Sequence, residues 1–211
     1  MGRPANTNER QAQIARALLH VMAKRGYDGA TVADVAKEAD IAPGLVHYHF
    51  KNKLEILLSA IAELAADYEA RLAQHLEEAG DDVIAQLRAF IDAHLRVGAA
   101  ADPAALACWI NISGEALREP RVRKAFTRVL SGSVARVRAI LDRGTTEGVF
   151  SCSDTDAAAA AIVATIQGYF VLAATARDLV PASSAAPATW TMARALLALP
   201  AKAASRRRSP S

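Results

Sequence analysis

Cysteine and aromatic residues are scarce in this chain of 211 residues. Its two cysteines, Cys108 and Cys152, form neither a CxxC pair nor the spacing of metal ligands. We therefore expect reduced thiols, without a disulfide or a metal site. Aromatic residues make up 5% of the chain, whereas hydrophobic residues reach 52% and many of them are alanine. Because alanine favours helices and disfavours strands, this composition predicts an all-α protein.

Long apolar runs and enzyme motifs are missing as well. Arg, Asp, Glu or Gln interrupts every apolar stretch of about 18 residues, and the start, MGRPANTNER, lacks the apolar segment of a secretory signal. We therefore expect a soluble, cytoplasmic protein. There is no GxSxG, GxGxxG, P-loop or HExxH motif, so we expect neither catalysis nor a cofactor. An enzyme that uses His94 and Cys108 as a nucleophile pair stays a distant alternative.

Positive charge is concentrated at the two ends of the chain. Residues 1–53 hold eight Lys/Arg against five Asp/Glu, and residues 202–211 hold four Lys/Arg and no acid. Residues 54–201 hold 13 against 17. This pattern favours a front segment that meets a polyanion, although a scatter of solvated charges has the same totals.

The front of the chain has the pattern of a helix-turn-helix unit. Apolar residues at helical spacing predict a first helix over residues 8–25, closed by Gly26. Thr31 is a good N-cap with Asp34 as its partner, and the short helix that follows ends near Asp40. Pro43 suits the first position of a third helix. Two short helices joined by so tight a turn are the signature of this motif.

A long amphipathic helix is expected from Asn52 to Gly80, and more helices follow it. They are predicted at about 82–97, 104–117, 121–146, 155–178 and 187–199. We therefore divide the chain into a helix-turn-helix unit (1–53), a helical body (54–200) and a disordered basic tail (201–211).

Residues 41–53, IAPGLVHYHFKNK, fit a helix that enters the major groove of DNA. Gly44 would let the backbone approach the duplex, while His47 and Tyr48 can donate hydrogen bonds to bases or phosphates. Lys53 would meet a flanking phosphate. The same residues also fit an ordinary half-buried helix after a plain turn, and physical reasoning alone leaves both interpretations open.

A family resemblance favours the first interpretation. Residues 8–55, and above all TVADVAKEADIAPGLVHYHFKNKLEIL with HYHFKNK at 47–53, resemble the DNA-binding domain of the tetracycline-repressor (TetR) family. The resemblance implies a dimeric transcriptional repressor that a small molecule releases from its DNA operator. It also implies that Thr31, Gly44, His47, Tyr48, His49 and Lys53 contact DNA.

The sequence departs from the usual pattern of that family in the turn and in the third helix. Asp40, Ala42, Pro43 and Leu45 stand where a glycine, a serine, a basic or polar residue and a threonine are frequent. We therefore add Pro43 and Leu45 to the expected DNA contacts, with Leu45 against a thymine methyl group. Arg3 lies on a short basic arm of the kind that can enter the minor groove.

The body resembles the betaine-repressor subgroup of the same family through residues 106–130, LACWINISGEALREPRVRKAFTRVL. We expect a pocket for an unidentified small molecule, with mostly apolar walls and a few polar groups. Its candidate residues are Phe90, His94, Trp109, Ile112, Ser113, Phe126, Gln167 and Tyr169. Trp109 and Tyr169 could face a cation whose charge Glu115 offsets, but a neutral apolar ligand fits the other walls equally well.

The last two helices are expected to form a homodimer. The run AAAAAIVATIQGYFVLAATA has small residues that allow close helix approach around a two-fold axis. The expected interface includes Ala164, Gly168, Val171 and Ala195. The alternatives are that this run is internal core, that the regulator is an activator or has no inducer, and, more distantly, that the chain is a helical scaffold or a membrane-surface protein.

Overall fold

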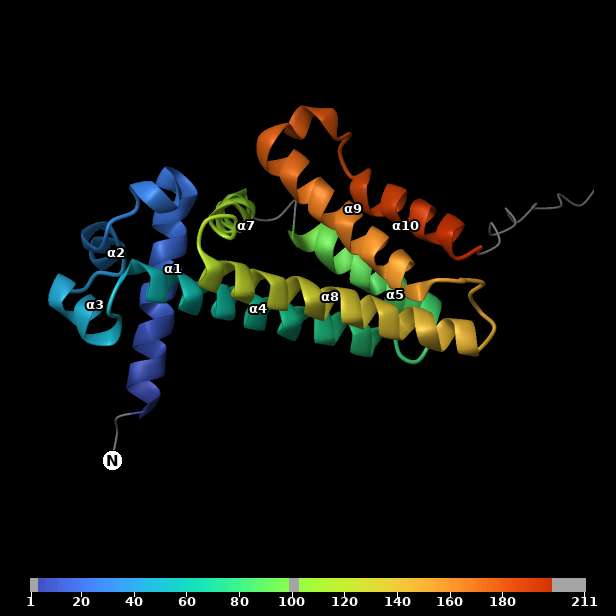
Figure 1. The fold of residues 1–211 in the computed structure, drawn as a ribbon, viewed down its shortest axis with the longest axis horizontal. Helices are drawn as coiled ribbons and strands as arrows, with labels where there is room; N and C mark the ends of the chain where they lie inside the picture. The colour runs from blue at the N-terminus through green and yellow to red at the C-terminus, as the bar shows by residue number, and fades with distance from the viewer. Residues whose placement is uncertain (1–3, 99–102, 199–211) are drawn as a thin grey trace, which may run out of the picture.

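The computed structural model describes residues 4–98 and 103–198. Over these residues the chain consists of helices and turns without any strand, which confirms the all-α prediction. Figure 1 shows a small unit, α1 to α3, at one end of an elongated bundle. The helix α4 leaves this small unit and runs along the bundle beside α8.

The small unit consists of α1 (Pro4–Gly29), α2 (Val32–Glu38) and α3 (Pro43–His49). Gly26 has φ of 69°, a left-handed conformation that glycine adopts readily, and α1 changes direction there. The helix was expected to stop at this glycine, but one more helical turn follows it up to Gly29. Residues 27–29, expected to form a turn after the first helix, are therefore helical.

The starts of the next helices match their local signals. Thr31 Oγ1 accepts a hydrogen bond from the Asp34 N–H (3.1 Å), and the Asp34 carboxylate accepts one from the Thr31 N–H (3.1 Å). This reciprocal pair is a capping box that fixes where α2 begins. Asp40 has φ of 51° in the tight turn after α2, and Pro43 is the first residue of α3. The helix-turn-helix geometry is thus set by residues close together in the chain.

The long helix α4 (Lys53–Glu78) joins the small unit to the bundle. Asn52 caps it by accepting a hydrogen bond from the Glu55 N–H at 3.0 Å. Its buried residues follow helical spacing, as predicted: Ile56, Leu57, Ala60, Ile61 and Leu72. One helix therefore contributes to the packing of both ends of the molecule.

The bundle is built from the remaining helices. They are α5 (Val83–Asp92), the π-helix η1 (Ala93–Gly98), α7 (Pro103–Glu115), α8 (Pro120–Thr146), α9 (Thr155–Thr175), the 3-10 turn η2 (Arg177–Leu179) and α10 (Ala185–Leu196). The segment expected as one helix over 82–97 divides into α5 and η1. The helix expected over 155–178 ends at Thr175, because Ala176 leaves the helical conformation (φ −149°, ψ 51°).

Two hydrophobic cores hold the molecule together. The second lies inside the bundle among α4, α5, α8, α9 and α10. The first contains residues of α1 to α4 together with Cys108, Ile112 and Ala116 of α7 and Val122 of α8. The packing therefore continues across residue 53, where the sequence suggested a domain boundary. That boundary stays a proposal about function and does not mark a gap in the core.

The outer helix α9 is unusually apolar for its exposure. By length and composition it could cross a membrane, with mean hydropathy of 1.8, and only 28% of its most apolar window is buried in the chain. It packs on α8, α7 and α10 on its inner side. Its outer side is therefore an apolar surface that no described part of the chain covers.

Candidate nucleic-acid interface and effector cavity

The helix α3 is anchored by one face and presents the other to solvent. Val46 is buried and Phe50, just after the helix, is buried as well. Tyr48 is 76% exposed, and His47 is also exposed. No atom lies within 4 Å of where a Cβ on Gly44 would be, so the backbone there is open to close approach. This combination leaves hydrogen-bonding side chains free on a rigid support.

The other residues predicted to contact DNA differ in their exposure and in the partners that they already have. His49 is half-buried, with its ring edge-on to Tyr48 and the ring centroids 5.0 Å apart. Leu45 is half-buried, while Pro43 is exposed. The Thr31 hydroxyl is occupied by Asp34 (2.6 Å), and hydrogen bonds from Thr31, with help from Arg25, hold the pKa of that carboxyl below its usual value. Arg3 lies outside the described residues.

Lys53 has a structural task in addition to its predicted DNA contact. Its ammonium donates hydrogen bonds to the carbonyls of Tyr27 (2.8 Å) and Ala30 (2.9 Å) and lies 4.3 Å from the centre of the Tyr27 ring. An ammonium has three N–H donors, so one is left for a phosphate. These contacts of Lys53 join the start of α4 to the end of α1. Burial is the main reason that the pKa of Tyr27 is raised to about 12, and Glu115, Asp28 and Glu119 raise it further.

Two lysines that the sequence analysis did not select lie on the same unit. Lys37 at the end of α2 and Lys51 between α3 and α4 are exposed. Neither has an ion-pair partner among the residues that the structure describes. By contrast, Lys24 and Arg25 of α1 pair with Glu38 (3.9 Å) and Asp34 (2.9 Å) of α2. The sequence does not show which of these cations are paired, because the partners of Lys24 and Arg25 lie on another helix.

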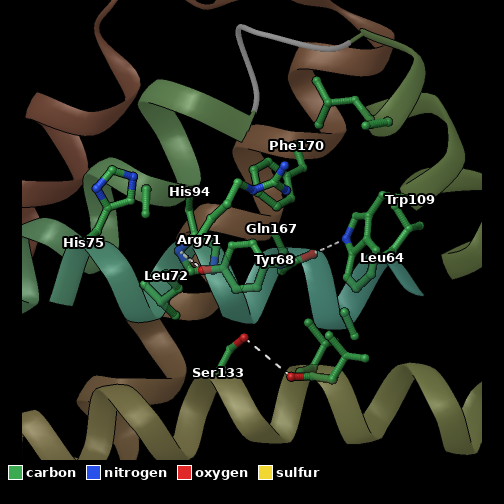
Figure 2. A pocket seen from close by; sticks show the side chains of 16 residues that line it. Leu64, Tyr68, Arg71, Leu72, His75, His94, Trp109, Ser133, Gln167 and Phe170 are labelled. Atoms are coloured by element: carbon green, nitrogen blue, oxygen red, sulfur yellow. Dashed lines mark hydrogen bonds between the residues drawn. The ribbon is translucent and has the colours of Figure 1, made fainter. Parts of the chain in front are cut away.

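A cavity of about 260 Å³ lies inside the bundle, between α4, η1, α7, α8 and α9. Figure 2 shows the side chains that line it. Its polar or aromatic lining residues are Tyr68, Arg71, His75, His94, Trp109, Ser133, Gln167 and Phe170. Its aliphatic lining residues are Leu64, Ala65, Leu72, Ala93, Ala105, Leu106, Val129 and Leu130. The apolar walls and few polar groups are typical of a small-molecule site.

A hydrogen-bonded chain crosses one end of this cavity. The Nδ1–H of His94 donates to the Phe90 carbonyl (2.8 Å), so its Nε2 accepts the hydrogen bond from the Tyr68 hydroxyl. Burial lowers the pKa of His94 to about 4, although the Phe90 bond opposes this. Burial also raises the pKa of Tyr68 well above its ordinary value. Both groups are therefore neutral at physiological pH.

The bond to Phe90 lies where α5 passes into the π-helix η1. His94 is the second residue of η1, and its ring donates to a carbonyl of α5 four residues earlier. This turn places His94 against Tyr68, 26 residues earlier in the chain.

A second polar contact lies on the opposite side of the cavity. Trp109 Nε1–H donates to Gln167 Oε1 at 2.8 Å and thereby links α7 to α9. Because an indole N–H can only donate, the oxygen of Gln167 is fixed as the acceptor and its NH₂ group remains available. The Trp109 ring also packs on Phe126, with centroids 4.7 Å apart.

Three of the eight predicted pocket residues line this cavity: His94, Trp109 and Gln167. The other five lie outside its wall. The ring of Phe90 packs against His94, and the ring of Phe126 packs against Trp109. Ile112 is part of the first core. Ser113 donates to the Ile110 carbonyl (2.8 Å), and Tyr169 faces a separate hollow of about 400 Å³ beside η2.

Arg71, His75, Ser133 and Phe170 line the cavity but were not among the predicted pocket residues. Leu64, Tyr68 and Leu72 lie on the long amphipathic helix expected from Asn52 to Gly80, whose apolar face predicts core packing. The available signal was a tyrosine and a nearby arginine in an otherwise aliphatic stripe. Glu115, suggested as a counter-charge, binds Arg118 (2.8 Å) and does not line the cavity.

The residues expected at a dimer interface are all exposed. Ala164, Gly168 and Val171 lie on the outer side of α9, and Ala195 lies on α10. Large apolar side chains share this surface with them: Leu172, Met192 and Leu196. The alternative that the run of small residues is purely internal core is wrong for Ala164, Gly168 and Val171.

Two family models match the chain. Residues 14–60 match the model described as bacterial regulatory proteins of the tetR family. Residues 83–199 match the model described as the C-terminal part of BetI-type transcriptional repressors. The HTH-type transcriptional regulator BetI of Stenotrophomonas maltophilia is 27% identical over 115 residues, which are 54% of this chain and 58% of that protein. The BetI regulator of Burkholderia thailandensis is 30% identical over the same shares. The matches thus span less than two thirds of these relatives.

Solved structures share the fold over nearly their whole length. A transcriptional regulator from a Rhodococcus species has a TM-score of 0.78 at 24% identity, covering 89% of this chain and 96% of its own. A putative regulator from Saccharomonospora viridis in complex with choline has a TM-score of 0.75 at 20% identity, covering 90% and 96%. FadR of Bacillus subtilis in complex with stearoyl-CoA has a TM-score of 0.72 at 22% identity, covering 88% and 97%.

Proposed function

Because the chain belongs to the TetR family of transcriptional regulators and carries a BetI-type C-terminal domain, we propose that it is a ligand-responsive repressor. In this proposal it binds a palindromic DNA operator as a dimer, in the bacterial cytoplasm, and a small molecule releases it. The family consists of regulators and not of enzymes, so the cavity serves binding without turnover.

The exposed face of α3 is the observation that carries the DNA-binding part of the proposal. Tyr48 and His47 offer hydrogen-bonding groups on a helix whose backbone is open at Gly44. Lys51 and Lys37, which are free cations nearby, would contact phosphates on either side of the groove. Phosphate contacts position such a helix, and the few base contacts select the sequence.

The exposed face of α9 and α10 supports the dimer. An apolar surface formed by Val171, Leu172 and Met192 is costly to leave in water. Pairing two copies of these helices into a four-helix bundle would bury it. A two-fold dimer would then place two α3 helices in successive turns of the major groove, about 34–36 Å apart.

The packing of α7 offers a route from the cavity to the DNA-binding unit. Trp109 and Leu106 line the cavity, while Cys108 on the same helix donates a hydrogen bond to the Leu19 carbonyl of α1 at 3.0 Å. A ligand that displaces α7 would therefore displace α1. Release requires that the ligand bind the displaced arrangement more tightly, since equal affinity shifts no equilibrium.

Two ligand-bound relatives make a small molecule a reasonable effector, although they do not agree on its nature. Choline is a cation, whereas stearoyl-CoA is a large anion. We therefore take from them only that this fold can hold a ligand in its helical body. If no ligand releases the operator, a DNA-binding regulator without an inducer, or an activator, remains as the alternative.

The DNA surface is tested by measuring operator affinity against salt concentration. An operator is first selected from random DNA, and binding is followed by fluorescence anisotropy. We expect Tyr48→Ala to weaken binding about tenfold, as for loss of a hydrogen bond to a charged group. We expect Lys51→Gln to weaken binding to specific and random DNA alike and to reduce the salt slope by about one.

Lys124→Gln is the matched control, because Lys124 is an exposed lysine on α8. It should bind with the wild-type affinity and salt slope. Wild-type affinity in both the Tyr48 and the Lys51 variant would show that the DNA surface lies elsewhere.

A further inference from the structure

We infer that the cavity takes a small monoanionic amphiphile, whose carboxylate lies at Arg71 and whose apolar part fills the space between α4, α7 and α9. This inference rests on the proposed function, since it names the chemical class of the effector. It depends on four features of the cavity: an unpaired cation, the lack of an acid, an excess of hydrogen-bond donors, and the volume.

Arg71 is an exposed arginine that also lines the cavity. Figure 2 shows its side chain rising from α4 at the end where Tyr68 and His94 lie. It makes no ion pair with any residue that the structure describes. Burial raises the pKa of the Tyr68 hydroxyl, and the positive charge of Arg71 acts in the opposite direction. A guanidinium is a good receptor for a carboxylate, since its planar donors match the two oxygens.

The described lining contains no Asp or Glu to compensate that charge. Of the carboxylates nearby in the chain, Asp67 is exposed and forms no ion pair with Arg71 in the described structure, and two others have partners. Glu69 binds Arg136 at 2.6 Å, and Glu78 lies 3.7 Å from His75. A cationic ligand would therefore share the cavity with Arg71 and find no described carboxylate in the wall. Like charges placed together repel each other, and a ligand that covers Arg71 would remove the water that screens them, so a cation is disfavoured.

Hydrogen-bond donors outnumber acceptors in the wall. Gln167 uses its oxygen on Trp109, so its NH₂ group faces a ligand without a competing partner. His94 uses both ring nitrogens, one on the Phe90 carbonyl and one on Tyr68. Such a wall favours a ligand that accepts hydrogen bonds, as a carboxylate does. His94 is neutral and adds no second positive charge to that of Arg71. A ligand with one negative charge therefore balances the charge of Arg71.

The volume limits the apolar part. A water molecule takes about 30 Å³ in the liquid, so a cavity of about 260 Å³ holds roughly nine groups of that size. Leu64, Leu106 and Phe170 make most of its wall apolar. An inorganic anion would leave this wall unfilled, whereas a medium-length aliphatic carboxylate would cover it.

The test uses three probes with one eight-carbon chain and different head groups: octanoate, octan-1-ol and octylammonium. Binding to the full-length protein is measured by isothermal titration calorimetry without DNA, with choline as a further probe. We expect octanoate to bind about tenfold or more tightly than octan-1-ol, as for a charged hydrogen bond, and we expect octylammonium and choline to bind least.

Substitutions at Arg71 separate head-group recognition from filling of the cavity. Arg71→Gln should lose about tenfold in affinity for octanoate and keep the affinity for octan-1-ol within about twofold. Arg71→Glu should favour octylammonium over octanoate. Arg128→Gln removes an exposed arginine next to the lining residue Val129 and should bind all probes as the wild type does.

Three outcomes would overturn the inference. The first is that octylammonium or choline binds the wild type as well as octanoate does. The second is that octanoate does not bind at all. The third is that Arg71→Gln binds octanoate unchanged. Operator release is measured separately by anisotropy. If octanoate binds through Arg71 but leaves the operator bound, the inference on ligand class stands and the proposed release of DNA fails.

Discussion

His94 shows how the surroundings of one residue determine its charge. Its ring is buried between Tyr68 and Phe90, with ring centroids 4.6 Å and 4.2 Å away. Burial lowers its pKa to about 4, against 6.5 for the ordinary side chain. Protonation would require a charge in an apolar site and would break the bond that Nε2 accepts from Tyr68. The residue therefore connects the stability of the bundle to pH.

The expected consequence is a loss of stability in mild acid. The unfolded imidazole takes up a proton near pH 6.5 and the folded one only near pH 4, so protons favour unfolding within this window. The contribution of His94 is complete above about pH 6.5 and decreases as the pH falls towards 4, by about 3 kcal/mol in all. Urea unfolding at pH 7.5 and pH 5 should show the decrease.

His94→Gln should remove a large part of that pH dependence, and His47→Gln, at an exposed histidine of α3, should retain it. The comparison between variants matters because carboxylates elsewhere also begin to protonate in this range. An equal loss of stability in acid for His94→Gln and the wild type would mean that another group is responsible.

At the scale of single helices, the start of α2 depends on two side chains. The Thr31–Asp34 capping box satisfies N–H groups that have no partner inside the helix. We expect Thr31→Ala to lower the free energy of unfolding by about 1 kcal/mol and Thr31→Ser to keep it. Chemical denaturation measures both. Thr127→Ala, at an exposed position within α8, should change it by less than about 0.5 kcal/mol, and an equal effect of the two alanine variants would contradict the capping role.

The helix starts could be predicted from the sequence because their causes are local. Thr31, Pro43 and Asn52 act on backbone groups within three positions, so a short stretch contains the whole signal. The division between α5 and η1 could not be predicted in this way. His94, at this division, contacts Tyr68 of another helix, and the spacing of apolar residues within 82–97 carries no information about that partner.

The cavity shows the same limit more strongly. Helical spacing identifies which residues of α4 face inwards but not whether a neighbour fills the space in front of them. Tyr68 was assigned to the core for this reason, and Ile112 was assigned to the pocket although the first core encloses it. Trp109 and Gln167, both predicted pocket residues, line the cavity, yet their hydrogen bond across 58 positions has no sequence signal.

At the scale of the whole molecule, the apolar face of α9 and α10 should decide the oligomeric state. Ala164 is exposed in the single chain, so Ala164→Arg should leave the fold intact and place a charge in the proposed interface. We expect a monomer by analytical ultracentrifugation and at least a tenfold loss of affinity for the palindromic operator, since one half-site then binds without the other.

Ala66→Arg is the corresponding control, because Ala66 is an exposed alanine on α4. It should remain a dimer with wild-type affinity. If Ala164→Arg stays dimeric, the interface lies elsewhere; if it is monomeric and binds the palindrome as tightly as the wild type, the two-fold model of DNA binding is wrong.

The first core has a consequence for protein engineering and for the divergence of such regulators. The side chains of α1 pack against Cys108, Ile112 and Ala116 of α7, and Gly26 approaches Asn111 so closely that a Cβ would lie 3.3 Å from its Oδ1. A chimera that joins residues 1–53 to the C-terminal domain of another regulator would pack α1 against the side chains of a different α7 helix. These side chains would not be complementary to α1. Functional exchange of the DNA-binding unit should therefore require the matching face of α7 to be transplanted with it. Natural substitutions on the two helices are expected to occur in compensating pairs.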